Sequence, residues 1–274
     1  MRTPGGLKTR LFKLAAVAAL HARGVLMYPR EIVADSAFVA LTMFIFSNLW
    51  RTVGAHQDLV TMTSLNLERL IWYLAFTEAI YMSTNSLPDG MPVDREVRTG
   101  DIAYRFVRPI GYASFHLAAH LGERVASFGL RLMVTSAVAW LLVGWPGLSA
   151  GAVRGALVSA LFCFFADATW TYAIAFLSFW VEDTYGLHLL YRRAMMVLGG
   201  VLVPLAAYPE WARQIAEVLP FRLLIDGPSR MFVAADSSGI WSLLGFQAGW
   251  GLLGCLPLVL LYRRGVVRLG AQGG

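Results

Sequence analysis

The sequence predicts an all-α integral membrane protein with six transmembrane helices. Its 274 residues are 57% hydrophobic and only 15% charged, with a mean hydropathy of +0.59, whereas soluble domains carry about 25% charged residues. Several apolar stretches approach or exceed the ~18–20 residues that cross a bilayer as a helix. Because these stretches and their short connections fill the chain, we expect a single transmembrane domain over residues 1–274.

Six stretches are predicted to span the membrane, and they alternate with segments that differ in basic charge. The spans are expected at 33–50, 66–83, 118–143, 155–181, 187–206 and 240–261. With the N-terminus inside, the inner segments hold 15 Arg and Lys residues and the outer segments hold five. Basic residues concentrate in cytoplasmic loops, so this distribution favours both termini in the cytoplasm.

Residues 1–32 are expected to form a cytoplasmic helix that lies in the membrane interface. The apolar run 14–20 is short and is followed by further basic residues without a clear small-residue cleavage site, so we interpret it as part of the mature chain rather than as a signal peptide. Basic residues precede the run and would meet anionic headgroups. One face of this helix would carry Leu7, Leu11, Leu14 and either Val17 or Ala18.

Residues 84–117 form the longest predicted inner segment, and its pattern indicates a turn followed by two short helices. The turn is Pro88-Asp89-Gly90. Asp94 is expected to cap a helix that ends at Thr99-Gly100, since glycine accepts the left-handed conformation. Asp101 would cap a second helix that Pro109 limits, with Ile102, Phe106 and Ile110 on one face and Arg105 and Arg108 elsewhere. A solvated loop whose arginines merely fix the topology is the alternative.

Three stretches resemble one branch of the bacterial ABC exporter permeases of the type-2 class. They are "EVRTGDIAYRFVRPI" (96–110), "SFWVEDTYGLHLLYRR" (178–193) and "VPLAAYPEWARQIAEVLPF" (203–221). The first resembles the basic-Ser/Thr-Gly-acidic/Asn-Ile-Ala-Tyr motif that follows the second span in that branch, and the likeness covers nearly the whole chain in order and spacing. The resemblance implies a permease of the bacterial inner membrane that moves substrate outward.

In the family that the chain resembles, the first inner loop is a coupling helix that docks into a separate ATPase subunit. The residues that the resemblance assigns to this contact are Asp94, Arg95, Glu96, Arg98, Thr99, Gly100, Asp101, Tyr104 and Arg108. The chain contains no G-x-x-x-x-G-K-[ST] loop, the motif that cradles nucleotide phosphates. We therefore expect no cofactor and no catalysis in this chain, with ATP and Mg²⁺ bound by the partner.

The other expected partners are a second permease, identical or paralogous, and membrane lipids. Nucleic acid is not expected, because the aromatic residues are not accompanied by a solvated basic groove. Two further functions stay open as alternatives. A proton-coupled secondary transporter usually has inverted repeats or broken helices, and an intramembrane hydrolase needs a Ser–His pair or paired aspartates; neither pattern is visible in the sequence.

The second inner turn, 182–186, carries the adjacent carboxylates Glu182 and Asp183. Neighbouring residues on a helix end point in different directions, and no His–Cys–carboxylate spacing accompanies them, so a metal or catalytic role is disfavoured. They would act as turn formers or as ion-pair partners of Arg192, Arg193 or the coupling region. The resemblance implies a second cytoplasmic contact here.

The outer segment, 207–239, contains a predicted amphipathic helix between Pro209 and Pro220. Polar pairs Glu210/Gln214 and Arg213/Glu217 lie at i, i+4 spacing. Proline suits a first helical turn and stops a helix at its far end. We expect an interfacial or re-entrant helix, which in related permeases roofs the translocation path. Its apolar face and the residue after it would comprise Trp211, Ile215, Val218, Leu219 and Phe221.

Two acidic residues, Glu78 and Asp167, lie deep within predicted spans. An isolated charge at the bilayer centre costs about 2.5–3.5 kcal/mol or more, so both need partners, water or protonation. They would line a substrate path, form structural hydrogen bonds or relay protons. His116 and His120 lie one turn apart, but a metal site is disfavoured because no third ligand accompanies them. Cys163 and Cys255 fall in apolar segments and are interpreted as small core residues.

Overall fold

The computed structural model describes residues 6–27, 29–56, 60, 63–84, 91–106, 110–181, 183–201, 203–234 and 239–272. Within these ranges every regular element is a helix and none is a strand. The predicted all-α class is therefore confirmed for the described part of the chain. The Pro88-Asp89-Gly90 turn, Arg108, Pro109 and Glu182 lie outside the described residues.

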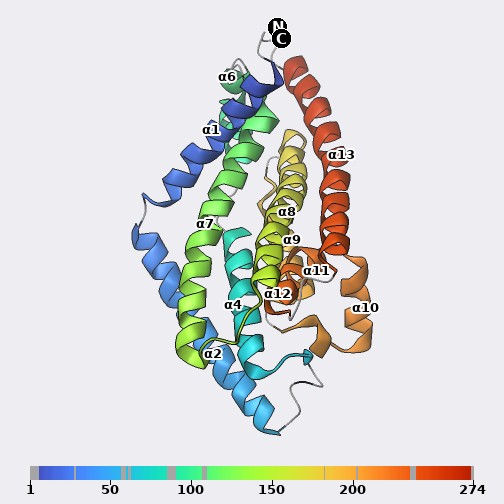
Figure 1. The fold of residues 1–274 in the computed structure, drawn as a ribbon. Coiled ribbons are helices and arrows are strands. Elements are labelled where there is room, and N and C mark those ends of the chain that lie inside the picture. Colours follow the sequence, from blue (N-terminus) through green and yellow to red (C-terminus); the bar gives the residue numbers. More distant parts are fainter. Residues whose placement is uncertain are drawn as a thin grey trace.

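The helices follow one another along an elongated bundle (Figure 1). The first half of the chain forms α1 (Leu7–Val25), α2 (Pro29–His56), α4 (Leu67–Thr84), α5 (Pro92–Thr99), α6 (Ile102–Phe106) and α7 (Tyr112–Val143). The second half forms α8 (Ala150–Ala175), the 3₁₀ turn η1 (Phe176–Phe179), α9 (Tyr185–Leu198), η2 (Leu205–Ala207), α10 (Glu210–Val218), α11 (Phe221–Leu224), α12 (Asp226–Val233) and α13 (Ile240–Gln272).

The start of α1 and the end of α13 lie at the same end of the bundle, which is the upper end in Figure 1, together with α6. At this end the ring of Tyr112 stacks on that of Tyr262 at 6.3 Å. The opposite, lower end joins the end of α7 to α2 and α4. There Arg51 Nη2 donates to the carbonyl of Leu142 at 2.7 Å, and the indole of Trp72 donates to the carbonyl of Gly144 at 2.9 Å. The long helices thus run from the upper end, where Tyr112 contacts Tyr262, to the lower end, where α7 contacts α2 and α4.

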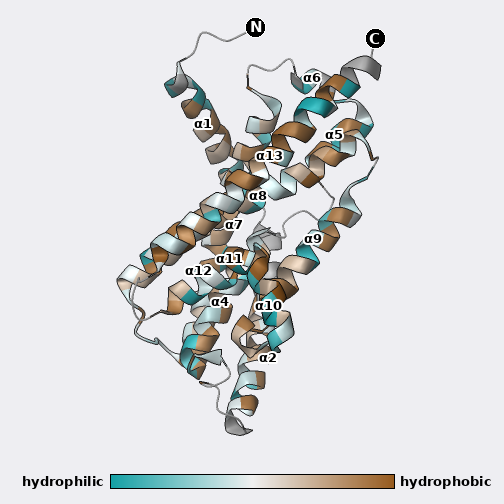
Figure 2. Cartoon of the chain, turned by 90° about the vertical axis from the view of Figure 1, so that its right-hand side faces the viewer, coloured by the Kyte–Doolittle hydropathy of each residue, from teal (hydrophilic) through white to brown (hydrophobic). Residues whose placement is uncertain are grey.

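Four of the described helices are long and apolar enough to cross a membrane. The qualifying segments are Ala37–Gly54, Tyr112–Val143, Ala150–Phe179 and Ile240–Arg268. They correspond to the predicted spans 33–50, 118–143, 155–181 and 240–261. Many of their large apolar side chains are exposed, such as Phe44, Met133 and Leu256. Figure 2 shows hydrophilic residues near the upper end on α1, α6 and α13. The pattern indicates a membrane-embedded protein.

The other two predicted spans differ from full-length transmembrane helices. α4 matches the predicted range 66–83, but it carries Glu68, Arg69 and Glu78, and most of its side chains are buried by other helices. α9 has only 14 residues, about 21 Å at 1.5 Å per residue. The continuous helix predicted over 187–206 is wrong, because the chain turns at Gly200, whose φ of 77° is the left-handed conformation that glycine adopts without strain.

The core of the bundle lies around α4 and is rich in aromatic rings. Phe76 of α4 stacks on Phe232 of α12 with ring centroids 4.3 Å apart. Phe76 also meets Phe128 of α7 edge to face at 5.5 Å, and Phe128 meets Phe164 of α8 in the same way at 5.3 Å. Aromatic pairs of these geometries add about 0.5–1.5 kcal/mol each beyond area burial. This chain of rings ties four helices together.

The N-terminal helix α1 packs along α7 rather than standing apart from the bundle (Figure 1). Gly122 permits the close approach, because a Cβ atom at this position would overlap the carbonyl oxygen of Ala18. Of the predicted apolar face, Ala18 makes this contact, whereas Leu11 is 57% exposed. Small residues at such crossings let helix backbones approach closely in membranes.

Candidate functional site

The predicted coupling segment forms two short helices at the upper end, separated by a left-handed glycine. α5 begins at Pro92 and ends before Gly100, whose φ is 76°. This confirms the predicted glycine stop. The predicted cap is wrong, because Met91 holds the N-cap position and makes no side-chain cap bond, and Asp94 lies within the first turn. Asp101 precedes α6 as predicted, and its carboxylate accepts a 2.9 Å hydrogen bond from the Thr99 hydroxyl.

Glu96 points into the bundle and attaches α5 to its neighbours. Its side chain is 4% exposed, and its Oε1 lies 3.0 Å from Nε of Arg105 in α6. The Tyr112 hydroxyl of α7 donates to Oε2 at 2.7 Å, and Nε2 of His116 lies 3.3 Å from the same oxygen. One carboxylate therefore links α5, α6 and α7. The sequence placed Glu96 in the predicted ATPase contact and did not reveal this buried cluster with Arg105, Tyr112 and His116.

Asp94 also points inward, and it joins the two predicted inner loops. The Thr184 hydroxyl, at the N-cap of α9, lies 2.9 Å from Oδ1 and 2.7 Å from Oδ2 of Asp94. Both residues are buried. The predicted acid of the second loop, Asp183, is exposed and accepts a 2.7 Å hydrogen bond from the backbone N–H of Tyr185. Thr184, which sequence reasoning did not single out, therefore makes the contact between the loops.

The remaining described residues of the predicted contact face outward. The acids at positions 94 and 96 are buried, whereas Tyr104 is 79% exposed. The segment thus has a buried face that holds it to the bundle and a solvent-exposed face that carries more arginines than acids. We call this outer face the basic surface, and its exposed members are Arg95, Arg98, Thr99, Gly100, Asp101 and Tyr104.

The two inward acids have pKa values shifted in opposite directions. Burial raises the pKa of Asp94 above its ordinary value, and the nearby Asp183 adds to this against the opposing hydrogen bonds of Thr184. Burial also opposes ionisation of Glu96, but hydrogen bonds from His116 and Tyr112, together with the charge of Arg105, outweigh it and lower the pKa of Glu96. Glu96 is therefore the acid held firmly in its charged form.

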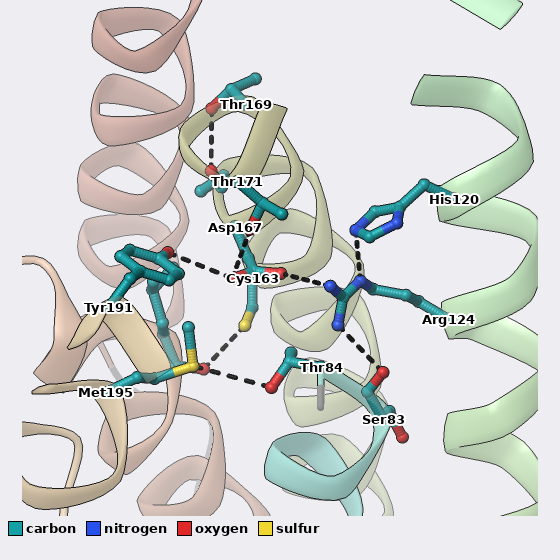
Figure 3. A network of polar contacts seen from close by, with 12 residues as sticks. Ser83, Thr84, His120, Arg124, Cys163, Asp167, Thr169, Thr171, Tyr191 and Met195 are labelled. Carbon is teal, nitrogen blue, oxygen red and sulfur yellow. Dashed lines mark hydrogen bonds and ion pairs between the residues drawn. The ribbon is translucent and has the colours of Figure 1, made fainter. Parts of the chain in front are cut away.

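A second polar centre is buried between α7 and α8 (Figure 3). Nη2 of Arg124 lies 3.4 Å from Oδ2 of Asp167, with side chains 5% and 1% exposed. Arg124 also donates to the Ser83 carbonyl at the end of α4, at 2.9 Å, and to Nε2 of His120 at 2.6 Å. On the other side, the Tyr191 hydroxyl of α9 donates to Oδ1 of Asp167 at 3.1 Å. The centre joins α4, α7, α8 and α9.

Asp167 therefore has a partner, which sequence reasoning did not identify. The signal that could have revealed it is the position of Arg124 inside a predicted apolar span, four residues after His120. Helical residues at i, i+4 share a face. Glu78 differs from Asp167, because it is 7% exposed and no hydrogen bond or ion pair connects it to any other residue that the structure describes.

The outer segment forms the predicted helix in slightly shortened form. α10 covers Glu210–Val218, with Pro209 at its N-cap, and Pro220 precedes α11. Trp211 is 68% exposed, and Glu210 accepts a hydrogen bond from Gln214 at 3.1 Å, as predicted. The predicted Arg213/Glu217 pair is wrong, because Arg213 pairs with Glu210 and Glu217 lies 3.5 Å from Arg222.

The turn after α10 is fixed by aromatic and polar contacts with the bundle. Phe221 meets the ring of Tyr191 edge to face at 5.6 Å. Asp226, which is 1% exposed, accepts a 2.8 Å hydrogen bond from the Tyr73 hydroxyl of α4. Nε of Arg230 lies 2.9 Å from both oxygens of the same carboxylate. The outer segment is therefore anchored to the central helix.

The described residues contain no group of three or more His, Cys, Asp or Glu side chains placed to hold a metal ion. His116 and His120 instead contact Glu96 and Arg124 respectively. Both cysteines are free thiols, and Cys163 is buried with its Sγ 2.8 Å from the Leu224 carbonyl. The chain was also compared with protein-family models, curated proteins and solved structures, and none of these comparisons finds a match.

Proposed function

We propose that this chain is the permease subunit of an ATP-driven exporter of the type-2 ABC class. One observation carries the proposal: α5 is bound to the bundle by its acids and leaves its arginines outside. A surface of this kind can transmit force, because a push on the outer face acts directly on the helices that the inner face contacts. The resemblance of "EVRTGDIAYRFVRPI" to the coupling motif supports the same function.

In this proposal a separate ATPase binds ATP and Mg²⁺ and docks on the basic surface. Its closure moves α5, and the contact of Glu96 with Tyr112 and His116 carries that movement into α7. The contact of Asp94 with Thr184 carries it into the start of α9. Two permeases, identical or paralogous, then alternate between inward and outward openings in the bacterial inner membrane, with both termini in the cytoplasm. This chain performs no chemistry.

The proposal is tested by co-purification of the ATPase from membranes of the native cell. Arg98→Glu reverses one charge of the basic surface and is expected to remove most of the ATPase from the purified complex. Arg154→Glu is the matched control, because Arg154 is also exposed but lies at the start of α8, next to the lower end. An ATPase yield that is equal in both variants and in the unaltered protein would contradict the proposal.

A second candidate function is proton-coupled secondary transport, and Glu78 is the observation that favours it. A buried carboxyl with no bonded partner among the described residues is suited to accept and release a proton. Transport that continues without any ATPase, collapses when the proton gradient is dissipated and is lost in Glu78→Gln would favour this candidate. Transport that persists in Glu78→Gln and requires ATP would exclude it.

A further inference from the structure

One side of α13 is exposed and apolar over most of its length. Its members follow one another at the seven-residue spacing of two helical turns, and they are Phe246, Leu253, Leu260 and Val267. The opposite side is buried by the bundle, where Gln247 and Leu258 are at most 4% exposed. Residues 242–262 include no charged residue. We call this exposed side the apolar stripe, and it suits contact with lipid acyl chains.

The length of the apolar stripe matches the thickness of a bilayer. Trp241, which is 82% exposed, lies at the start of α13, and tryptophan is enriched at membrane–water interfaces. Arg263 follows Trp241 by 22 residues, which is about 33 Å of helix at 1.5 Å per residue. The hydrocarbon core of a bilayer is about 30 Å thick. A membrane that places Trp241 at one interface therefore places Arg263 among the headgroups of the other.

Three arginines surround the last member of the apolar stripe. Arg263 and Arg264 precede Val267 by four and three residues, so they lie beside it on the helix surface, and Arg268 follows Arg264 at i, i+4 spacing. We call these three residues the α13 arginines. All three are exposed, and no hydrogen bond or ion pair joins them to another residue that the structure describes. Residues 240–274 contain no acid, so the neighbouring sequence does not balance these charges.

The upper end of α13 is held against the bundle by its other side. The ring of Tyr262 lies 5.3 Å from that of Phe176 and stacks on that of Tyr112. A Cβ atom at Gly265 would overlap the ring of Phe179, so the backbone of α13 packs directly on η1, which α5 also contacts. Because Gly265 is buried whereas the α13 arginines are exposed, these arginines do not face the bundle. They form a surface separate from the basic surface on α5 and α6.

We propose that the α13 arginines bind the headgroups of anionic phospholipids. A guanidinium presents donors in a fork that matches two oxygens of a phosphate, and basic residues directly beyond a membrane-spanning helix are attracted to anionic lipids. An acidic protein surface also fits a group of arginines. The apolar stripe favours lipid, because it leads directly into the α13 arginines and continues among them as Val267, which is 73% exposed.

A photo-reactive amino acid at Val267 tests this proposal. The purified chain is reconstituted in nanodiscs that contain equal amounts of phosphatidylglycerol and phosphatidylcholine with the same acyl chains, and the lipid adducts are identified by mass spectrometry. We expect about fivefold more phosphatidylglycerol than phosphatidylcholine in the adducts, which is the preference that roughly one arginine near an anionic surface provides. The same amino acid at Leu253 is the positional control. It lies on the same side of α13 among the acyl chains and is expected to give both adducts equally.

Variants of the α13 arginines show whether their charge causes the preference. The triple variant Arg263→Gln, Arg264→Gln and Arg268→Gln is expected to lower the adduct ratio at position 267 to that at position 253. The corresponding triple replacement by lysine keeps the charge and is expected to keep most of the preference. The single variant Arg264→Gln, which alters the chain less, is expected to lower the ratio in part.

The matched control removes basic charge from another part of the upper end. Lys8→Gln with Arg10→Gln replaces exposed residues of α1 and is expected to leave the adduct ratio at position 267 unchanged. A ratio at position 267 no higher than at position 253, or a ratio that the glutamine variants leave unchanged, would overturn the proposal. So would an equal decrease in the α1 variant, or adducts at position 267 in native membranes that contain protein instead of lipid.

This lipid site is independent of the proposed ATPase contact. The proposal rests on the apolar stripe and the α13 arginines, and the nanodiscs contain no ATPase. Failure of the coupling proposal would therefore leave the adduct ratio unchanged. Absence of a lipid preference at position 267 would likewise leave the docking of an ATPase on α5 and α6 unaffected.

Discussion

Arg124 of α7 and Asp167 of α8 form an ion pair in which Nη2 and Oδ2 lie 3.4 Å apart and both side chains are almost inaccessible. The two charges would each be unfavourable alone in an apolar bundle. Together, and with hydrogen bonds to Ser83 and Tyr191, they connect helices that are far apart in sequence.

Breaking this pair is expected to destabilise the protein strongly. Arg124→Leu leaves Asp167 buried without its counter-charge, and loss of one partner of a buried pair costs about 3–5 kcal/mol. Asp167→Leu is expected to have a similar effect. The double variant should lose about 0.5–3 kcal/mol less than the sum of the singles, as coupled neighbours do. Unfolding in detergent measures all three, and strictly additive losses would contradict the pairing.

The contact of Glu96 with α7 is expected to weaken in acid. Because the pKa of Glu96 is lowered in the folded protein, its contribution to stability is present above the ordinary glutamate pKa and is lost as the pH falls through the lowered value. The protection of the α5 amides, measured relative to their intrinsic exchange rate at each pH, should therefore decrease on acidification below the ordinary range. Glu96→Gln should raise exchange at neutral pH and reduce that acid dependence. Identical pH profiles in the two proteins would contradict the assignment.

The contribution of Asp94 to stability is expected to change with pH in the opposite direction to that of Glu96. Its pKa is raised, so its charged form is penalised at neutral pH and protonation relieves the penalty. Asp94→Asn keeps an acceptor for the Thr184 hydroxyl and is expected to be tolerated. Thr184→Val removes the donor and leaves a buried carboxylate, which costs about 1–3 kcal/mol. Unfolding measurements should therefore show greater destabilisation for Thr184→Val than for Asp94→Asn, and the reverse order would refute the contact.

Gly122 is expected to control the packing of α1. A Cβ atom there would overlap the Ala18 carbonyl oxygen, so Gly122→Ala must push α1 away from α7. Overpacking of this kind costs about 1–3 kcal/mol. Gly129→Ala on the same helix is the control, because its Cβ would meet nothing within 4 Å. Proteolysis of α1 should rise in Gly122→Ala only, and equal rates in both variants would show that the helices are not in close contact.

The sequence predicted most of the helix positions, because long apolar runs and Gly or Pro stops are local signals. The left-handed Gly100 and the outer helix between Pro209 and Pro220 are examples. The range 187–206 was mispredicted because apolar composition continues through Gly200, where the backbone turns. Hydropathy alone does not distinguish a continuous helix from a short helix followed by a turn.

The sequence predicted where the charged segment lies in the chain, but not which of its side chains face the bundle. The acids and arginines of the motif alternate closely in sequence, and only the packing of α5 shows that Glu96 faces Tyr112 while Arg95 and Arg98 face outward. The partners Thr184 and Arg124 come from other helices, at separations of 90 and 41 residues from Asp94 and Ser83. Contacts over such separations depend on the tertiary arrangement, which residue spacing does not reveal.

In the proposed mechanism another polypeptide delivers the energy of ATP through the basic surface. A photo-reactive amino acid at Thr99, which is exposed between the two short helices, tests this directly in native membranes. We expect a cross-link to an ATP-binding subunit from Thr99, and no such cross-link from the exposed Trp145 beside the lower end. Adducts from Thr99 that contain only lipid, or an ATPase that cross-links equally from both positions, would contradict it.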